Sequence, residues 1–251
     1  EYTNDPDATK QAQLVQAAID KKVDGIAVTD PNTGALGDSI KKAVAAGIPV
    51  SMFNAGGPDA MGLGAIGYFG QAESDAGLAV GKRLVADGAK NAICVIQEQG
   101  QQQLEDRCEG VAKGAGSVKV ERIYVDGRND AAQVTTLQAK FTQDPTIDYV
   151  VTLGAPFALN ASKAIEAAGS KAKLGTFDTS KDLVTAIKDK KVTWAIDQQP
   201  YLQGYLAVES LWLYKTNGNV IGGGQNVPTG PAFIDDKNVE AVAGFAANGT
   251  R

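Results

Sequence analysis

The stretch Asp148–Pro156, DYVVTLGAP, shows the pattern that decides the fold: a short apolar run that ends in a glycine-containing tip. The run lacks the alternation of apolar and polar residues that is typical of a strand with one solvated face. It therefore predicts a strand buried on both faces, as in a parallel sheet. Helix-length segments separate nearly all of the similar runs, so the sequence predicts an α/β protein. The other five runs are Asp24–Asn32, Ile48–Gly57, Ala92–Gly100, Lys173–Ser180 and Val192–Pro200.

Polar side chains follow most of these predicted strands. In open α/β sheets, ligands bind beyond the carboxyl ends of the strands. Carboxylates and side-chain amides at those ends can exchange hydrogen bonds with a polyhydroxylated ligand. The tips carry Asp30, Asn54, Gln97, Glu98, Gln99, Asp178, Asp197 and Gln198.

Composition narrows the functional classes. The chain has 251 residues, of which 43% are hydrophobic and 21% charged, as in a globular protein. Its net charge of −5 argues against a nucleic-acid-binding surface. It contains no histidine, which excludes Ser-His-Asp and Cys-His catalysis and every metal site that uses histidine. We therefore expect a binding protein, neither an enzyme nor a holder of a metal or cofactor.

The chain carries one glycine pattern that is typical of another class of protein. Gly62, Gly64 and Gly67 match the Gly-x-Gly-x-x-Gly fingerprint of dinucleotide-binding proteins. That motif requires a strand before it and a helix that opens inside it. Here a proline-containing loop precedes the glycines, and 65–69 itself predicts a short strand. We expect a crossing between domains at this point.

Five motifs, taken in order, resemble one known family. They are DGIAVTDPN (24–32), AAGIPV (45–50), DRCEG (106–110), LGTFD (174–178) and IDQQP (196–200). Together they resemble the periplasmic sugar-binding proteins of the ribose-receptor type, the type I solute receptors of ABC importers. The resemblance implies two Rossmann-like lobes with parallel sheets, joined by three hinge crossings. It places residues 1–70 and 199–227 in the first lobe, and 71–198 and 228–251 in the second.

The same resemblance implies a function. Such a protein binds a small neutral carbohydrate or polyol between its lobes and presents it to an ABC permease in the membrane. We expect a periplasmic or extracellular monomer, with lipid anchoring left open. The alternative is the effector-binding core of a LacI-type transcriptional repressor, which shares the fold. Against it, no helix-turn-helix precedes Glu1 and acidic charge dominates.

The chain departs from the family pattern in two places. Family members begin with a strand and helix that contribute to the ligand pocket, whereas this chain begins at what would be the second strand. It opens on EYTNDPDATK without a signal peptide, as expected of a mature form or a fragment. In the ribose receptor an Asp-Arg pair follows the strand equivalent to Ile48–Phe53, and this chain has Asn54-Ala55 there. We therefore expect a ligand other than ribose.

Seven positions at the strand tips or matching family motifs are the candidate ligand contacts. The planar fork of Arg107 can donate to two ligand oxygens at once, and Asp178 can accept from vicinal hydroxyls. Alternatives remain open: a surface arginine, a helix N-cap at Asp178, a turn at Asp30, a solvated charge at Arg128 and core packing of Phe157. The seven are Asp30, Asn54, Arg107, Arg128, Phe157, Asp178 and Gln198.

The two cysteines, Cys94 and Cys108, lie in a predicted strand and in the helix that follows it. They could be two buried thiols or one disulfide, which requires Cα atoms within about 7 Å. An exported protein favours the disulfide.

Overall fold

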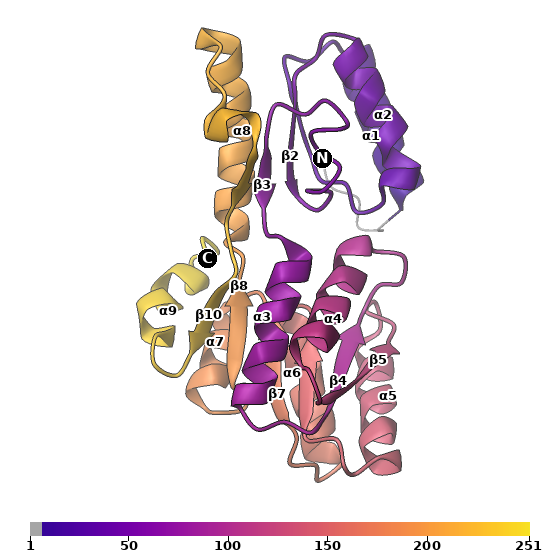
Figure 1. The fold of residues 1–251 in the computed structure, drawn as a ribbon, viewed down its shortest axis with the longest axis vertical. Coiled ribbons are helices and arrows are strands. Elements are labelled where there is room, and N and C mark those ends of the chain that lie inside the picture. Colours follow the sequence, from indigo (N-terminus) through magenta and orange to yellow (C-terminus); the bar gives the residue numbers. More distant parts are fainter. Residues whose placement is uncertain (1–6) are drawn as a thin grey trace. The chain divides into compact units, whose positions relative to one another are not determined.

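The computed structural model describes residues 7–251 (Figure 1). The chain divides into two compact units. One takes the chain up to Gln71 together with Pro200–Thr229, and the other comprises Ala72–Gln199 and Gly230–Arg251. The chain passes from one unit to the other at the three boundaries between these segments. Each unit is built on a largely parallel sheet, which confirms the predicted α/β fold class.

The first unit contains a four-stranded parallel sheet in the order β1-β2-β3-β9. Its core includes Leu36 and Ile40 of α2 and Met52 of β2, all fully buried. In chain order its elements are α1 (Ala8–Asp20), β1 (Ile26–Val28), α2 (Thr33–Ala45), β2 (Val50–Asn54), β3 (Tyr68–Gly70), α8 (Pro200–Asn217), the 3-10 helix η1 (Ile221–Gly224) and β9 (Asn226–Pro228).

The glycine-rich segment before β3 differs from the sequence-based expectation. We predicted a strand over 65–69, but β3 begins at Tyr68. A hydrogen-bonded turn occupies the preceding residues: the amide of Leu63 donates to Asp59 O, and that of Ala65 to Ala60 O. Gly64 has a φ of +88°, which a glycine adopts without strain. The turn delays the strand, and a strand, not a helix, follows the glycines.

The second unit contains a six-stranded sheet in the order β10-β8-β7-β6-β4-β5. Only the pairing of β10 with β8 is antiparallel among the described strand pairs of this sheet. Its elements are α3 (Glu73–Ala86), β4 (Asn91–Ile96), α4 (Gln102–Gly114), β5 (Lys119–Tyr124), α5 (Asp130–Gln143), β6 (Tyr149–Thr152), α6 (Ala155–Ala167), β7 (Lys173–Phe177), α7 (Lys181–Lys188), β8 (Trp194–Asp197), β10 (Ala232–Asp235) and α9 (Val239–Ala247).

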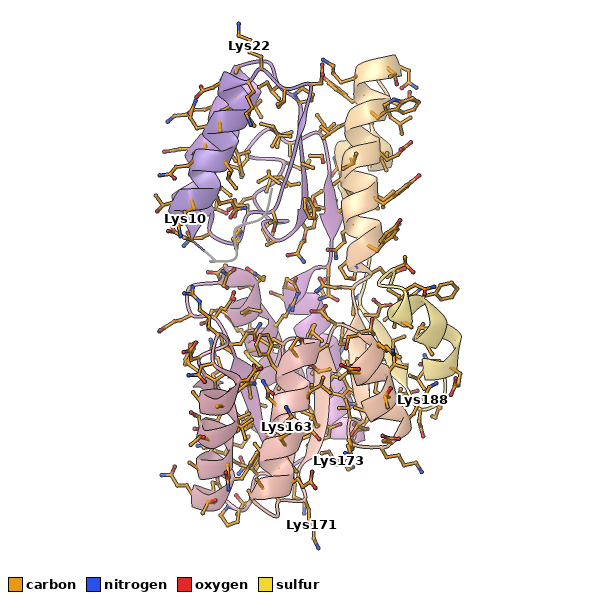
Figure 2. All side chains as sticks on the ribbon, turned by 180° about the vertical axis from the view of Figure 1, so that it is seen from behind. Lys10, Lys22, Lys163, Lys171, Lys173 and Lys188 are labelled. Atoms are coloured by element: carbon orange, nitrogen blue, oxygen red, sulfur yellow. A yellow bond between two sulfur atoms is a disulfide. The ribbon has the colours of Figure 1, made fainter. Side chains whose placement is uncertain are left out.

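Both faces of this second sheet are covered by apolar side chains. Along β4, Ile93 and Val95 pack into one core, whereas Cys94 and Ile96 pack into the other. All four residues of β6 are buried. This explains why the strand runs lack polar alternation, as predicted. Lysines such as Lys22 and Lys171 instead extend from the surfaces of their units into solvent (Figure 2).

Helices α3 and α4 contact each other directly through their backbones. A Cβ added to Gly77 of α3 would lie 2.2 Å from the carbonyl oxygen of Arg107, and one added to Gly110 of α4 would lie 2.4 Å from that of Ser74. Gly81 and Gly114, four residues farther along their helices, make equivalent contacts. Only glycine fits these positions. The close approach brings the first turn of α3 against the middle of α4.

A hydrogen-bonded network joins elements at the amino ends of β6 and β8. The hydroxyl of Tyr149 donates to Asp87 Oδ2 at 2.7 Å, and Trp194 Nε1 donates to the Tyr149 oxygen at 2.7 Å. Burial alone would raise the pKa of Asp87, but the hydrogen bonds from Tyr149 and Arg83 outweigh it and lower the pKa. The Asp87 carboxylate thus accepts hydrogen bonds from Tyr149, Trp194 and Arg83, all in its own unit. Among residues 7–251, no helix combines the length and apolarity that a membrane span requires.

The glycine contact predicts a steep cost for one added methyl group. We expect Gly110→Ala to lower the free energy of unfolding by about 2 kcal/mol, because the methyl group would meet backbone atoms of α3 that cannot move aside. Gly244→Ala in α9 is the matched control, because nothing lies within 4 Å of the added Cβ. We expect it to be neutral or slightly stabilising. Urea unfolding followed by circular dichroism measures both, and equal stabilities of the two variants would contradict the contact.

Candidate ligand-binding site

Three of the predicted ligand residues form one hydrogen-bonded chain at the carboxyl ends of β7 and β8. Gln198, which follows β8, donates from Nε2 to Asp178 Oδ1 at 2.7 Å. Arg107 of α4 donates from Nη2 to Gln198 Oε1 at 3.5 Å. All three side chains belong to the second unit. The structure therefore joins residues that are up to 91 positions apart in sequence.

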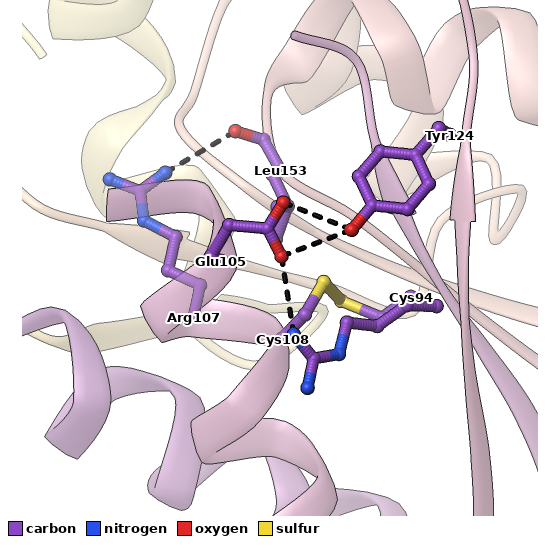
Figure 3. Close-up of a disulfide and its surroundings, with 7 residues drawn as sticks. Cys94, Glu105, Arg107, Cys108, Tyr124 and Leu153 are labelled. Atoms are coloured by element: carbon purple, nitrogen blue, oxygen red, sulfur yellow. Dashed lines mark hydrogen bonds and ion pairs between the residues drawn. A yellow bond between two sulfur atoms is a disulfide. The ribbon is translucent and has the colours of Figure 1, made fainter. Parts of the chain in front are cut away.

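Arg107 is held by a buried ion pair with Glu73, the first residue of α3. Nε lies 2.6 Å from Glu73 Oε2, and Nη2 lies 2.8 Å from Oε1. The two side chains are 3% and 9% exposed. Nη1 donates to Leu153 O at 3.3 Å (Figure 3), and the guanidinium lies 4.6 Å from the centre of the Phe177 ring. We expected Arg107 to donate two hydrogen bonds to a ligand, but here its bidentate partner is the Glu73 carboxylate.

The position of α4 is fixed on two sides. A disulfide joins Cys108 to Cys94 of β4, with Cα atoms 5.8 Å apart (Figure 3). The glycine contact with α3 holds the opposite side of the helix. Arg107 is the residue before Cys108 and contacts Gly77 through its own carbonyl group. Its side chain is therefore placed by covalent and close-packed restraints, and the surface-arginine alternative does not apply.

Asp178 occupies a conformation that few residues adopt. Its φ is +64°, in the left-handed region, and Asn54 at the end of β2 has a φ of +63°. Asn and Asp tolerate this region better than most residues. Burial raises the pKa of Asp178, although the nearby Arg107 charge and the Gln198 hydrogen bond oppose the shift. The helix-cap alternative fails, because Ser180 accepts from the Leu183 amide at 3.1 Å and caps α7.

An aromatic ring lies near the Asp178 carboxylate. Gly154, at the N-terminus of α6, lies beside both groups. A Cβ added to it would lie 3.0 Å from Phe157 Cδ2 and 3.9 Å from Asp178 Oδ2. Phe157 is half-buried on the first turn of α6. The ring and the carboxylate thus flank the same glycine. This combination suits a ligand with apolar C–H groups on one side and hydroxyl groups on its edge.

In the first unit, Asp30 follows β1, and Asn54 is the last residue of the neighbouring parallel strand β2. Asp30 is 2% exposed, and within residues 7–251 neither of its carboxylate oxygens has a hydrogen-bond partner. Burial raises the pKa of Asp30, although the Thr33 hydroxyl and the Asn32 amide oppose the shift. Asn54 is half-buried and donates from Nδ2 to Gln203 Oε1 of α8 at 3.4 Å. Both donors near Asp30, those of Thr33 and Asn32, belong to the turn after β1, so the turn alternative stays open, and a ligand contact at Asp30 stays a prediction.

Arg128 follows Gly127, whose amide donates to Gln97 O at 3.0 Å. It is exposed on the turn after β5, the edge strand that β4 and β6 separate from β7. Its amide donates to Asp126 Oδ1 at 2.9 Å, a local turn bond. A role for Arg128 in ligand binding stays a prediction.

Two residues of the candidate site, Glu73 and Gln97, were not among the seven predicted ligand contacts. Glu73 was not considered because its partner lies 34 positions away. The signal was present, since Gly77 and Gly81 follow it at four-residue spacing, a pattern that permits close helix packing. Gln97 was noted only as a strand tip. Its Oε1 is buried at the end of β4 without a hydrogen-bond partner among the described residues, as expected of a group that receives a ligand hydroxyl.

Comparison with known proteins identifies the family. A family model described as periplasmic binding protein domain matches residues 1–219. The chain belongs to this family. That confirms the resemblance seen in the motifs, and it identifies the chain as a binding protein, not an enzyme.

Relatives within the family share much of the chain. A carbohydrate transporter from Acidothermus cellulolyticus, crystallised in complex with myo-inositol, is 53% identical and covers 100% of this chain and 87% of its own, with a TM-score of 0.97. The xylose/arabinose-binding protein of Sulfolobus acidocaldarius is 25% identical over 93% of this chain. The ribose import binding protein of Bacillus subtilis is 24% identical over 81%. This chain spans 62% and 67% of the lengths of these two relatives.

Removing the charge of Glu73 should leave a buried cation without its partner. We expect Glu73→Gln to lower the free energy of unfolding by about 3–5 kcal/mol, the usual cost of breaking a buried pair. Glu109→Gln is the control, because Glu109 pairs with Lys113 on the same helix but in solvent. It should cause no measurable change. A similar loss of unfolding free energy for both substitutions would show that the buried Arg107–Glu73 pair stabilises the fold no more than an exposed pair does.

The raised pKa of Asp178 predicts a pH-dependent difference between two forms of the protein. A carboxyl group whose folded pKa exceeds its unfolded value of about 3.9 stabilises the fold below that value, and loses this contribution as pH rises through the folded pKa. Asp178→Asn cannot titrate. Its stability relative to the wild type should therefore increase as pH rises from about 4 to 7. Urea unfolding at a series of pH values tests this, and a pH-independent difference would contradict the burial of the charge.

Proposed function

We propose that this protein is the extracytoplasmic solute-binding component of an ABC importer, and that it binds a small neutral polyol or sugar. The observation that carries the proposal is an excess of buried acceptors at the carboxyl ends of the strands. Both Asp30 oxygens and Gln97 Oε1 are buried, and no well-formed hydrogen bond within residues 7–251 reaches them, although the Thr33 hydroxyl and the Asn32 amide lie near Asp30. Hydroxyl groups of a polyol are donors, and supplying them would remove the cost of these unpaired groups.

The charges of the candidate residues other than Arg128 favour a neutral ligand. Arg107 is the cation of the cluster in the second unit, and Glu73 neutralises it at 2.6 Å. Asp178 and Asp30 remain as carboxylates whose pKa values burial raises. A phosphorylated or acidic sugar would bring a further negative charge close to them. Neutral hydroxyl groups avoid this repulsion and still satisfy the acceptors.

Two observations favour a cyclitol over ribose as the first ligand to test. The Acidothermus cellulolyticus relative, 53% identical over the whole chain, holds myo-inositol. Asn54-Ala55 replaces the Asp-Arg pair of the ribose receptor, which removes an arginine donor from the first unit. myo-Inositol offers a hydroxyl donor on every ring carbon, which suits a site rich in acceptors.

Transport follows from differential affinity. A ligand shifts a conformational equilibrium only by as much as it binds one state better than the other. Hydroxyl groups that engage residues of both units would favour a closed state that a membrane permease recognises. That one ligand contacts both units, and that the protein is anchored or free outside the cytoplasm, stay predictions.

Ligand-dependent thermal unfolding tests the proposed function. With myo-inositol at 100 times its Kd, we expect about 2.7 kcal/mol of added stability, which raises Tm by several degrees. Asp178→Ala should lose this shift. Glu240→Ala is the control, because Glu240 is exposed on α9 and pairs with Lys188. No shift with any cyclitol, pentose or hexose would contradict the proposal, as would an unchanged shift in Asp178→Ala.

A further inference from the structure

Gln133 of α5 is a polar residue on a helix face that is otherwise apolar. It precedes Leu137 and Phe141 by four and eight residues, and all three side chains are buried. Leu137 and Phe141 pack into the core of the second unit. A buried amide must be hydrogen-bonded to avoid a desolvation penalty, whereas an apolar side chain at the same position carries no such requirement. The hydrogen bonds of Gln133 are therefore the feature to explain.

Gln133 ends a chain of hydrogen bonds between α5 and α6. Asn160 of α6 donates from Nδ2 to Asp130 Oδ1 at 2.8 Å and to Gln133 Oε1 at 3.0 Å. Gln133 then donates from Nε2 to the carbonyl oxygen of Phe157 at 3.2 Å. A carboxylate and a backbone carbonyl both accept, so only one orientation of the two amides satisfies this chain. The chain thus delivers a donor to the backbone of Phe157.

Side chains of two further elements donate to the backbone between β6 and α6. Arg107 of α4 donates from Nη1 to Leu153 O at 3.3 Å. Thr176 of β7, which is fully buried, donates from Oγ1 to Gly154 O at 3.1 Å. Together with the bond from α5, these contacts hold the same stretch of backbone at three carbonyl groups.

This restraint determines where the Phe157 ring lies. A Cβ added to Gly154 would lie 3.0 Å from Phe157 Cδ2, so the ring packs directly on the glycine. Gly154 is also the N-cap residue of α6, and it has no side chain with which to cap the helix. The first turn of α6, and the ring with it, is held by Gln133 and Thr176 instead. A ring that is already in place costs a ligand less ordering than a mobile one.

We propose that Gln133 is a positioning residue for ligand binding and that it acts through Phe157. This role rests on the proposed function, in which the Phe157 ring meets the C–H groups of a polyol or sugar beside Asp178. Gln133 is 0% exposed, so its effect passes through the backbone of α6. Without its hydrogen bond, a ligand must order the first turn of α6 as it binds. Ordering one such side chain weakens affinity by about threefold to tenfold.

Isothermal titration calorimetry with myo-inositol, or with a pentose or hexose that binds the wild type more tightly, tests the role of Gln133. We expect Gln133→Met to raise the Kd by about threefold to tenfold, because methionine fills the space but cannot donate to Phe157 O. Gln138→Met is the matched control, because Gln138 of α5 donates to Ala167 O at the other end of α6 at 3.4 Å. It should leave the Kd unchanged. An unchanged Kd in Gln133→Met would overturn the proposal, as would an equal rise in Gln138→Met.

A double-mutant cycle tests whether Gln133 acts through the ring. In a Phe157→Ala background the ring is gone, so adding Gln133→Met should change the Kd no further. An equal loss of affinity in both backgrounds would overturn the positioning role, because a purely structural effect does not depend on the ring. Should Gln133→Met fail to fold, Thr176→Val removes the donor to Gly154 O and should show the same dependence on the ring. Independence from the ring would then overturn the proposal.

Failure of the positioning role and failure of sugar binding give different results. If the wild type binds no cyclitol, pentose or hexose, the proposed function is wrong and the role of Gln133 falls with it. If the wild type binds one of them and Phe157→Ala binds it equally tightly, the ring has no part in recognition. That result would overturn the role of Gln133 and leave sugar binding intact.

Discussion

The direct contact between the backbones of α3 and α4 is the constraint on which the candidate site of the second unit depends. Because Gly77 and Gly110 have no side chains, the helices approach until a Cβ would collide with main-chain oxygens. Glu73 then reaches Arg107, and the disulfide from Cys108 holds the same helix against the sheet. The ion pair is therefore a result of helix packing. It fixes Arg107 beside Gln198 and Asp178, and it cancels the charge that would otherwise attract anions.

The two ends of the second sheet differ in how their polar groups are satisfied. At the amino end, Asp87, Tyr149 and Trp194 form a closed network in which each group has a partner. At the carboxyl end, Gln97 Oε1 is buried without one in the described chain. A protein selected only for stability has no reason to keep such a group. The contrast supports the proposal that the ligand binds at the carboxyl end, as in other parallel α/β sheets.

The fold could be predicted because its signal is local and repeated. Strands such as Tyr149–Thr152 are apolar on both faces, and helix-length segments separate them, so a parallel sheet follows from the pattern alone. The family motifs led to Arg107, Asp178 and Gln198, which the structure joins. What could not be predicted depends on distant contacts. The partner of Arg107 is set by the crossing of α3 and α4, and the start of β3 by a hydrogen-bonded turn that leaves no periodic signal.

A crystal structure of the chain with myo-inositol tests the central claim most directly. Ligand hydroxyl oxygens should lie within hydrogen-bonding distance, about 2.6–3.2 Å, of an Asp178 carboxylate oxygen. The bidentate pair between Arg107 and Glu73 should remain closed in the complex. A complex in which Arg107 leaves Glu73 to grip the ligand, or in which the ligand binds away from Asp178, would contradict this account.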